Sequence, residues 1–468
     1  MAVGLAAASA LVSCVLAAAT DADSHAADAS GSQATTVIPN DEHYVHQTWN
    51  FNAIHASAAW SYTTGSSRVL VAVIDSGKLA HPDLNAKWTG GYDFYNGDAD
   101  PSDFGTYHHG VHVAGIIGAA SNNTTGVTGL CWSCGLMPVL AADSGGSSPV
   151  NSPGYQDYLN HTYHVLANSI RYAAGLSVHD GAGHTVQAPK PADVINISLG
   201  NYNITCPAEV QAAVDDAVAA GSTVVAAAAN GDDTGDYVAD HYMWASCRNV
   251  IVVTAADAAG HRAAYASSGA GVTLAAPGGA DRGGDAGWGA LVGCTDPSEP
   301  RGEGTAGVFS SWSTASGAPC YRYWAGTSMA TPHVSGVAAL MKSRNASLSP
   351  AQIKAILTRT AQPIACPTAE CGAGLVDAAA AVQAAVFSAA GSCTASGGSV
   401  RCSAAITGGV APFSYQWQGL IHAAALPPAG AATAHGSCAP AGQPAWVQVQ
   451  VTDALGRVSQ SVATFTCH

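Results

Sequence analysis

The chain has 468 residues, of which 48% are apolar and only 10% are charged, and its formal net charge is −15 at pH 7. This length and apolar content suffice to bury a large core, so we expect one large domain and a smaller one rather than a disordered or fibrous protein. With 16 Lys and Arg and no basic run, the chain is not expected to bind nucleic acid.

The N-terminal segment is apolar and rich in small residues. Residues 1–19 favour a secretory signal peptide, which would be cleaved near Ala19. The sequence LVSC, which ends at Cys14, leaves open a lipid-anchored form at the cell surface. Residues 20–38 are small, polar and acidic, which is typical of a linker. Because the twelve cysteines after Cys14 are an even number in an exported chain, we expect disulfide bonds.

Short apolar runs alternate with helical patterns in the middle of the chain. Four runs are almost entirely apolar, as is typical of parallel strands that are buried on both faces: 68–75, 192–200, 222–230 and 249–257. Residues 207–221 carry apolar side chains on one helical stripe, with proline suited to the first turn and glycine to the end. This alternation predicts a doubly wound α/β domain, in which helices cover both faces of a mostly parallel sheet.

Polar residues stand where ligands usually bind in such a sheet, at the carboxyl ends of the strands. Asp75 ends the first run and Asn230 the third, although both residue types also favour ordinary turns. The segment YHHGVHVAGIIGAA, residues 107–120, contains three histidines. In GTSMATPHVSG, residues 326–336, Ser328 lies just before a predicted helix. The free backbone N–H groups at a helix start favour negative charge, which suits a serine that becomes an attacking oxygen. A serine that only caps the helix is the alternative. Aspartate, histidine and serine in this order suit nucleophilic catalysis.

Three motifs resemble those of the subtilisin family of serine proteases, especially its secreted, disulfide-bearing members from Gram-negative bacteria. These motifs are VAVIDSG, HGVHVAG and GTSMATPHVSG, and the resemblance runs from about residue 39 to about residue 385. It implies a serine endopeptidase that acts through an acyl-enzyme, in which Asp75 orients His109, His109 is the general base and Ser328 is the nucleophile. His112, the second histidine of its motif, is then expected to be packed rather than catalytic.

The resemblance also assigns the residues around the substrate. It implies that Asn230 donates to the oxyanion together with the backbone N–H of Ser328. It implies that extended substrate pairs with a short strand that contains Ser198, Leu199 and Gly200. Ala229 stands where the family usually has glycine, beside the specificity pocket, and its backbone is strained if its φ is positive.

A structural calcium ion is a further implication of the resemblance. Its ligands would be oxygens from three separate segments, as a hard cation requires. They would be Gln47, Asp83, Ser121, Asn123, Thr125 and Val127. Asn123 would bind through its side chain, and Ser121, Thr125 and Val127 through their carbonyls. A polar turn without a metal is the alternative.

The expected domain boundaries follow from the motifs and from composition. Residues 39–386 would form the catalytic domain, 387–391 a linker, and 392–468 a small immunoglobulin-like β-sandwich that serves in adhesion, as a spacer or as a structural cap. The glycine-rich residues 278–325 are expected to form a surface loop. Nearness in the sequence motivates most of the disulfide pairs that we expect: Cys131–Cys134, Cys206–Cys247, Cys294–Cys320, Cys366–Cys371, Cys393–Cys402 and Cys438–Cys467.

These features together predict a secreted, extracellular and monomeric protease whose substrates are proteins or peptides. Members of the family are usually made with a folded prodomain, and residues 20–38 are too few to form one. Either the start of the chain is placed too late, which the missing basic residues before the apolar run favour, or the enzyme folds unaided. We expect that a prodomain supplied in trans would restore activity. The alternative functions are a catalytically inactive subtilisin fold that binds a partner, and a surface-tethered protein.

Overall fold

The computed structural model describes most of the chain after its N-terminal segment. The described residues are 36–105, 108–142, 155–201, 204–231, 242–280, 288–294, 304–314, 316–366, 368–424, 426 and 430–468. The predicted signal peptide, Cys14 and nearly all of the linker at 20–38 lie outside them. In the part that is described, no helix combines the length and the apolar character needed to cross a membrane.

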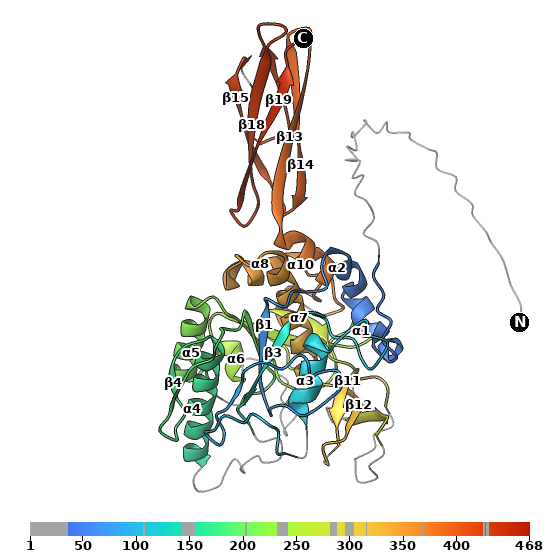
Figure 1. Ribbon diagram of the computed structural model, residues 1–468, viewed down its shortest axis with the longest axis vertical. Helices are drawn as coiled ribbons and strands as arrows, with labels where there is room; N and C mark the ends of the chain where they lie inside the picture. Colours follow the sequence, from blue (N-terminus) through green and yellow to red (C-terminus); the bar gives the residue numbers. More distant parts are fainter. Residues whose placement is uncertain are drawn as a thin grey trace, which may run out of the picture. The chain divides into compact units, whose positions relative to one another are not determined.

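A seven-stranded parallel sheet lies at the centre of the larger domain (Figure 1). In spatial order its strands are β2 (Tyr92–Asp93), β3 (Gly135–Leu140), β1 (Leu70–Asp75), β6 (Val194–Ile197), β7 (Thr223–Ala227), β8 (Val250–Ala256) and β9 (Leu274–Pro277). Every residue of β1, β6, β7 and β8 is buried. The four predicted strands are all present, and each is shorter than predicted at one or both ends.

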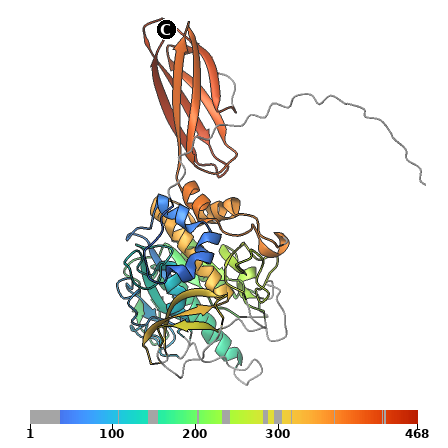
Figure 2. The same ribbon diagram turned by 90° about the vertical axis from the view of Figure 1, so that its right-hand side faces the viewer.

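Helices cover both faces of this sheet, which confirms the doubly wound α/β fold (Figures 1 and 2). The helices are η1 (Tyr44–Gln47), α1 (Thr48–Ala53), α2 (Ala56–Tyr62), α3 (His109–Gly118), α4 (Tyr155–Ala173), α5 (Ala208–Ala219), α6 (Met243–Ser246), α7 (Thr327–Arg344), α8 (Pro350–Thr360), α9 (Thr368–Cys371) and α10 (Ala378–Ala385). Side chains alternate across β1: Val71 and Val73 pack with α3 and α7, whereas Leu70 and Ile74 pack with α4 and α5. The helix predicted at 207–221 is α5.

The segment 278–325 is not the surface loop that its glycine content indicated. It contains a three-stranded antiparallel sheet in the order β10 (Trp288–Val292), β12 (Pro319–Trp324) and β11 (Val308–Ser313). All of β11 is buried, and the Ser310 hydroxyl donates to the carbonyl of His112 in α3 over 2.8 Å. The prediction was wrong because the serines of β11 are buried by a partner that is distant in the sequence, so the strand shows no apolar alternation.

The C-terminal residues form antiparallel strands only. One sheet has the order β13 (Phe387–Ser396), β14 (Ser399–Gly408), β17 (Thr433–Cys438), β16 (Ala423–Ala424), and the other has the order β15 (Ser414–Ile421), β18 (Pro444–Thr452), β19 (Val458–Thr466). Their shared core contains residues of both sheets, such as Val400 and Val447. Because β13 begins at Phe387, the residues 387–391 that we expected to be a linker belong to a strand instead.

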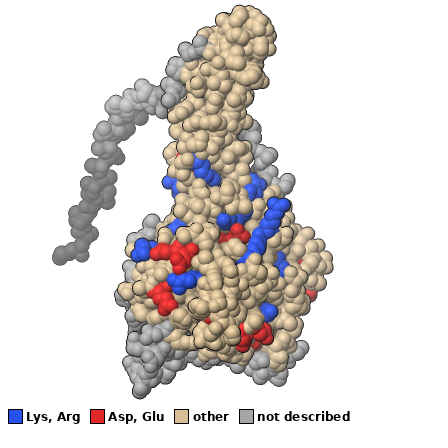
Figure 3. Space-filling view, turned by 60° about the vertical axis from the view of Figure 1, so that its left-hand side comes forward, with Lys and Arg blue, Asp and Glu red and all other residues tan. Residues whose placement is uncertain are grey.

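Among the described residues six disulfides are present, and they are the six predicted pairs. A separate short hairpin joins β4 (Val178–His179) to β5 (Thr185–Val186). On the face of the molecule in Figure 3, the few Lys and Arg side chains are scattered among Asp and Glu, and most of the surface is neither acidic nor basic. The described residues on this face form no continuous basic patch of the kind that is typical of nucleic-acid binding.

Candidate active site

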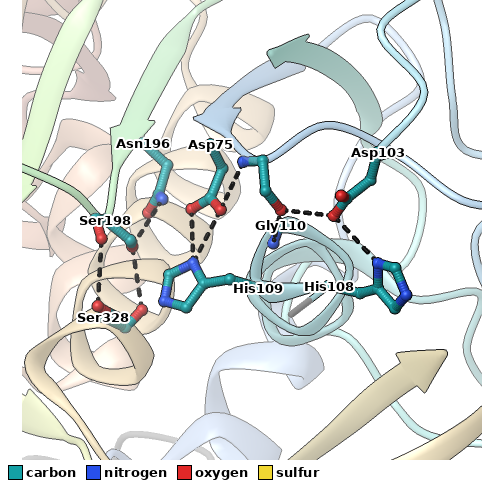
Figure 4. A network of polar contacts seen from close by, with 9 residues as sticks. Asp75, Asp103, His108, His109, Gly110, Asn196, Ser198 and Ser328 are labelled. Carbon is teal, nitrogen blue, oxygen red and sulfur yellow. Dashed lines mark hydrogen bonds and ion pairs between the residues drawn. The ribbon is translucent and has the colours of Figure 1, made fainter. Parts of the chain in front are cut away.

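A carboxylate and an imidazole meet at the carboxyl end of β1. Asp75 is the last residue of β1 and is 2% exposed, and His109 is the first residue of α3. The Nδ1 atom of His109 lies 2.8 Å from Oδ1 and 3.0 Å from Oδ2 of Asp75 (Figure 4). The backbone N–H of Ser76 also donates to Oδ1 of Asp75, over 2.8 Å. The carboxylate is therefore held in place from two sides.

The electrostatic surroundings favour the protonated form of His109. Burial lowers the pKa of His109, but the charge and the hydrogen bond of Asp75 outweigh burial, and the negative charge of Asp103 adds to them. The net result is a pKa above the ordinary value of 6.5. An imidazolium that forms at His109 is thus stabilised by two carboxylates.

Ser328 lies in the first turn of α7, beside the imidazole of His109 (Figure 4). Its hydroxyl donates to the carbonyl of Ser198 over 3.1 Å, and the Ser198 hydroxyl donates back to the carbonyl of Ser328 over 3.0 Å. The end of β6 and the start of α7 are therefore bonded to each other at the serine. Its position at a helix N-terminus agrees with the prediction from the apolar stripe that follows it.

Asn230 follows β7 and is oriented by the residue before Ser328. Its Oδ1 accepts the backbone N–H of Thr327 at 2.8 Å and the Thr327 hydroxyl at 2.9 Å. The Nδ2 of Asn230 and the backbone nitrogen of Ser328 lie 3.5 Å and 3.6 Å from the position that a Cβ atom on Gly326 would occupy. Two N–H donors therefore border one small space next to Ser328.

The segment that follows β6 adjoins this space. The Leu199 carbonyl accepts the indole N–H of Trp244 at 2.6 Å. A Cβ atom on Gly200 would lie 2.4 Å from the hydroxyl of Tyr242 and 2.7 Å from Nε1 of Trp244, so only glycine fits there. Sequence analysis named Leu199 and Gly200 but missed the two aromatic residues, because α6 is a single turn far along the chain.

Two further sequence expectations concern backbone and packing. Ala229 has a φ of 86°, which is the strained conformation expected if alanine replaces glycine at this position. His112 is fully buried, and its Nε2 donates to the carbonyl of Arg322 over 3.0 Å. Burial lowers the pKa of His112 to about 3, so this ring is neutral at ordinary pH. The structure thus brings His109, and not His112, to Asp75.

Comparison with known proteins identifies the family to which this chain belongs. Residues 66–391 match the model of the subtilase family. The chain belongs to the subtilase family. An extracellular protease of Xanthomonas campestris is 35% identical to this subtilase over 384 residues, which cover 75% of this chain and 58% of that protein. The chain therefore spans little more than half the length of that relative.

Two other relatives match along nearly their whole length. Thermitase of Thermoactinomyces vulgaris is 31% identical over 346 residues, which cover 74% of this chain and 99% of thermitase. A solved protease of Pseudoalteromonas arctica has a TM-score of 0.62 and 33% identity, and the match covers 74% of this chain and 99% of that chain. The sheet and helices of this subtilase are therefore those of a known protease fold.

Gln47, the first of the expected calcium ligands, uses its side-chain amide within the protein. Its Nε2 donates to the carbonyls of Thr128 and Phe309, over 2.9 Å and 3.3 Å, and its Oε1 accepts the N–H of Thr128 at 2.8 Å. These bonds hold η1 against the loop at 121–128. The amide oxygen of Asn123 is also engaged, since it accepts the backbone N–H and the hydroxyl of Thr125 at 2.9 Å and 2.8 Å.

Two buried carboxylates contact the same loop, and sequence analysis named only one of them. Asp41 is 5% exposed and accepts the N–H groups of Asn122 and Asn123, each over 2.8 Å. Asp83 is 1% exposed and accepts the N–H of Val127 at 2.9 Å. Burial raises the pKa of Asp83 to about 7, and the nearby charge of Asp41 adds to the increase. The sequence did contain a signal for Asp41, because acidic residues are scarce in this chain and Asp41 is one of them.

The donor set fits a hard cation better with Asp41 than with Gln47. Among the described residues, the ion pairs of Lys and Arg involve neither Asp41 nor Asp83, so no side-chain cation offsets a charge on these buried carboxylates. The described part of the chain contains no group of three or more His, Cys, Asp or Glu side chains that could hold a metal. A cation here would therefore take its remaining ligands from carbonyl and amide oxygens, which suits calcium.

Proposed function

We propose that this subtilase is a serine endopeptidase that hydrolyses peptide bonds through an acyl-enzyme. The observation that supports this most strongly is the bond between Asp75 and His109 beside a serine at a helix N-terminus. The Ser328 oxygen would attack the scissile carbonyl carbon while its proton passes to Nε2 of His109. The same proton would then go to the departing amine, and a water molecule would release the acyl group from Ser328 by the reverse route.

Asp75 supports this proton transfer without taking the proton itself. Its two oxygens fix the Nδ1–H tautomer of His109, so that Nε2 presents a lone pair toward Ser328. Because Asp75 is buried and fixed by the N–H of Ser76, it needs little reorganisation when the imidazolium forms. The pKa of His109, which is raised mainly by Asp75 against the effect of burial, is consistent with this role.

The negative charge of the tetrahedral intermediate would be stabilised by the side-chain N–H of Asn230 and the backbone N–H of Ser328. Thr327 uses both of its donors on Oδ1 of Asn230, which turns the NH₂ end of the amide toward the reacting carbonyl. The N-terminal end of α7 adds the positive end of its dipole. This arrangement is preorganised for a charge that exists only during the reaction.

Extended substrate would pair with the segment from Ser198 to Gly200. Backbone groups of successive residues in an extended segment point to opposite edges. Because the Leu199 carbonyl points to Trp244, the backbone groups of Ser198 and Gly200 would point to the opposite edge of the segment, the edge where Ser328 lies. In the free protein the Ser328 hydroxyl donates to Ser198, and a rotation of its side chain would turn it to His109.

Calcium is proposed as a structural ion and not as a participant in catalysis. It would be held by the carboxylates of Asp41 and Asp83 and by oxygens of residues 121–127, with Asp41 taking the part first assigned to Gln47. When bound, the ion supplies positive charge that neutralises the two buried carboxylates. The names of the Xanthomonas and Dichelobacter nodosus relatives, which are called extracellular proteases, favour secretion of this chain as well.

The experiment that tests the proposed function is labelling with a fluorophosphonate probe, followed by peptide mapping. Only an activated serine reacts with this probe. We expect the label on Ser328 and no label after Ser328→Ala. Ser343→Ala is the control, because it removes a serine from the far end of the same helix, and it should leave labelling complete. A folded protein that takes no label would instead be the inactive binding protein that we considered as the alternative.

A further inference from the structure

A second buried carboxylate lies next to the Asp75–His109 pair. Asp103 is in the loop that precedes α3, and its side chain is 1% exposed. Its Oδ2 accepts the hydroxyl of Ser76 at 2.7 Å, and its Oδ1 accepts the N–H of Gly105 at 2.8 Å. The backbone N–H of Asp103 donates to the carbonyl of Lys78 over 2.9 Å. Asp103 is therefore fixed to the chain that leaves β1.

The Ser76 hydroxyl links the two residues of the pair through their neighbours. Besides donating to Asp103, its oxygen accepts the N–H of Gly110 at 3.0 Å. Ser76 directly follows Asp75, and Gly110 directly follows His109. The Ser76 hydroxyl has only one hydrogen, and the bond to Asp103 uses it. The lone pairs of the Ser76 oxygen are then free to accept the N–H of Gly110. The end of β1 is thus bonded to the first turn of α3 at the point where the pair forms.

His108 lies on the other side of Asp103. Its Nδ1 is 3.3 Å from Oδ2 of Asp103, and its Nε2 is 2.9 Å from the carbonyl of Thr314. The His108 side chain is 3% exposed. Thr314 directly follows β11, so this bond connects His108 and Asp103 to the buried sheet of residues 278–325.

We propose that Asp103 is a positioning residue for the protease reaction, acting through the Ser76 hydroxyl on the geometry of Asp75 and His109 and through its charge on the imidazolium. This inference rests on the proposed function. Burying a carboxylate costs desolvation free energy, so Asp103 is not placed here for stability alone. The bond of Asp103 to the Ser76 hydroxyl aligns Asp75 and His109, which come from different elements.

The charge of Asp103 has a consequence that simple packing lacks. Three titratable groups face His109: Asp75 at the end of β1, Asp103, and His112 one turn along α3. Trp324 in β12 packs edge-on against the His109 ring, with the ring centroids 5.1 Å apart. Of these, the two aspartates favour the protonated ring. Removing the charge of Asp103 should therefore move the acid limb of the kcat/KM profile to lower pH.

The test compares Asp103→Asn, Ser76→Ala and Ser76→Thr in the full chain, with a peptide substrate. We expect Asp103→Asn and Ser76→Ala each to lower kcat by about 10-fold, as for loss of one hydrogen bond to a charged group, with little change in KM. Only Asp103→Asn should also shift the acid limb to lower pH. Ser76→Thr keeps the hydroxyl and should restore most of the activity.

Asp180→Asn is the matched control. Asp180 is also a buried aspartate that contacts a histidine, since its Oδ2 accepts from Tyr92 at 2.7 Å and lies 2.6 Å from Nδ1 of His184. Its replacement should lower the melting temperature without changing kcat or the acid limb. If Asp103→Asn behaves like Asp180→Asn, Asp103 is structural only and the proposal fails.

Two further outcomes separate this proposal from the function on which it rests. If Ser328→Ala retains activity, the proposed protease mechanism is wrong. If Ser328→Ala is inactive while Ser76→Ala keeps the wild-type kcat, the mechanism stands and the positioning role of Asp103 is refuted. Ser76→Ala also decides the matter if Asp103→Asn does not fold, because it removes only a hydroxyl and leaves the Asp103–His108 pair in place.

Discussion

The proposed oxyanion site can be tested by a graded series of variants at Asn230 and Thr327. Asn230→Ala removes the Nδ2 donor and leaves two donors of Thr327, its N–H and its hydroxyl, without their shared acceptor. Thr327→Val keeps the donor but removes one of the two bonds that orient it. Asn230→Asp keeps the shape of the side chain and places a negative charge where the oxyanion would form.

The structure sets the order of these effects. Asn230→Ala should lower kcat by about 10² to 10³, which is the effect known for the oxyanion asparagine of subtilisin itself, with KM little changed. Thr327→Val loses one hydrogen bond of about 0.5–1.5 kcal/mol, so kcat should fall by about 2- to 10-fold. Asn230→Asp should be at least as slow as Asn230→Ala, because the Thr327 donors favour the ionised carboxylate, which repels the oxyanion.

The assay is steady-state hydrolysis of a peptide anilide, with kcat and KM determined separately and the folded state checked by its melting temperature. A loss confined to KM would mean that Asn230 only binds substrate. A larger loss for Thr327→Val than for Asn230→Ala would mean that Thr327 acts on the reaction by some route other than the Asn230 amide, and the reasoning would be refuted.

Three other predictions concern the triad, the loop and the strained residue. Ser328→Ala or His109→Ala should lower kcat by about 10⁶, the loss known for the same residues of subtilisin, while a folded His112→Ala should keep most activity; the reverse pattern between the histidines would overturn the assignment. Asp83 has a folded-state pKa of about 7 against an ordinary 3.8, so in chelator the stability of the protein should decrease as pH rises from about 4 to about 7. Calcium should raise the melting temperature most near and above neutral pH. Equal melting temperatures with calcium and with chelator would exclude the site. Ala229→Gly relieves a φ of 86° but adds entropy to the unfolded chain, so calorimetry should show a gain below about 1 kcal/mol; a clear loss would contradict the strain.

Much of the fold was predictable because its signals are local. The apolar runs that became β1, β6, β7 and β8 contain the information for burial on both faces within a few residues each. The helix α5 likewise showed its stripe, its start and its end in its own sequence. The pairs of cysteines were also mostly close in the chain, as Cys366 and Cys371 are.

The candidate site was predictable to the extent that residue type reveals chemistry. Asp75, His109, Ser328 and Asn230 were named from motifs and strand ends. In the structure His109 contacts Asp75, and Asn230 accepts from Thr327, the residue before Ser328. Their orientation was not predictable. The hydrogen bond from the Ser328 hydroxyl to Ser198 depends on the rotamer of the serine and on the approach of β6 to α7, which no short segment encodes.

By itself, the sequence located four of the seven strands of the main sheet and helix α5, and it named the residues expected to carry the chemistry, because periodicity and residue type act over a few positions. Only the tertiary structure decided which groups support them. Asp41 reaches Asn122, 81 residues away, and His108 reaches Thr314, 206 residues away. The burial of the serines in β11 depends equally on distant partners. A polar residue looks the same in a surface turn and in a buried network, and the difference appears only when folding removes water from around it.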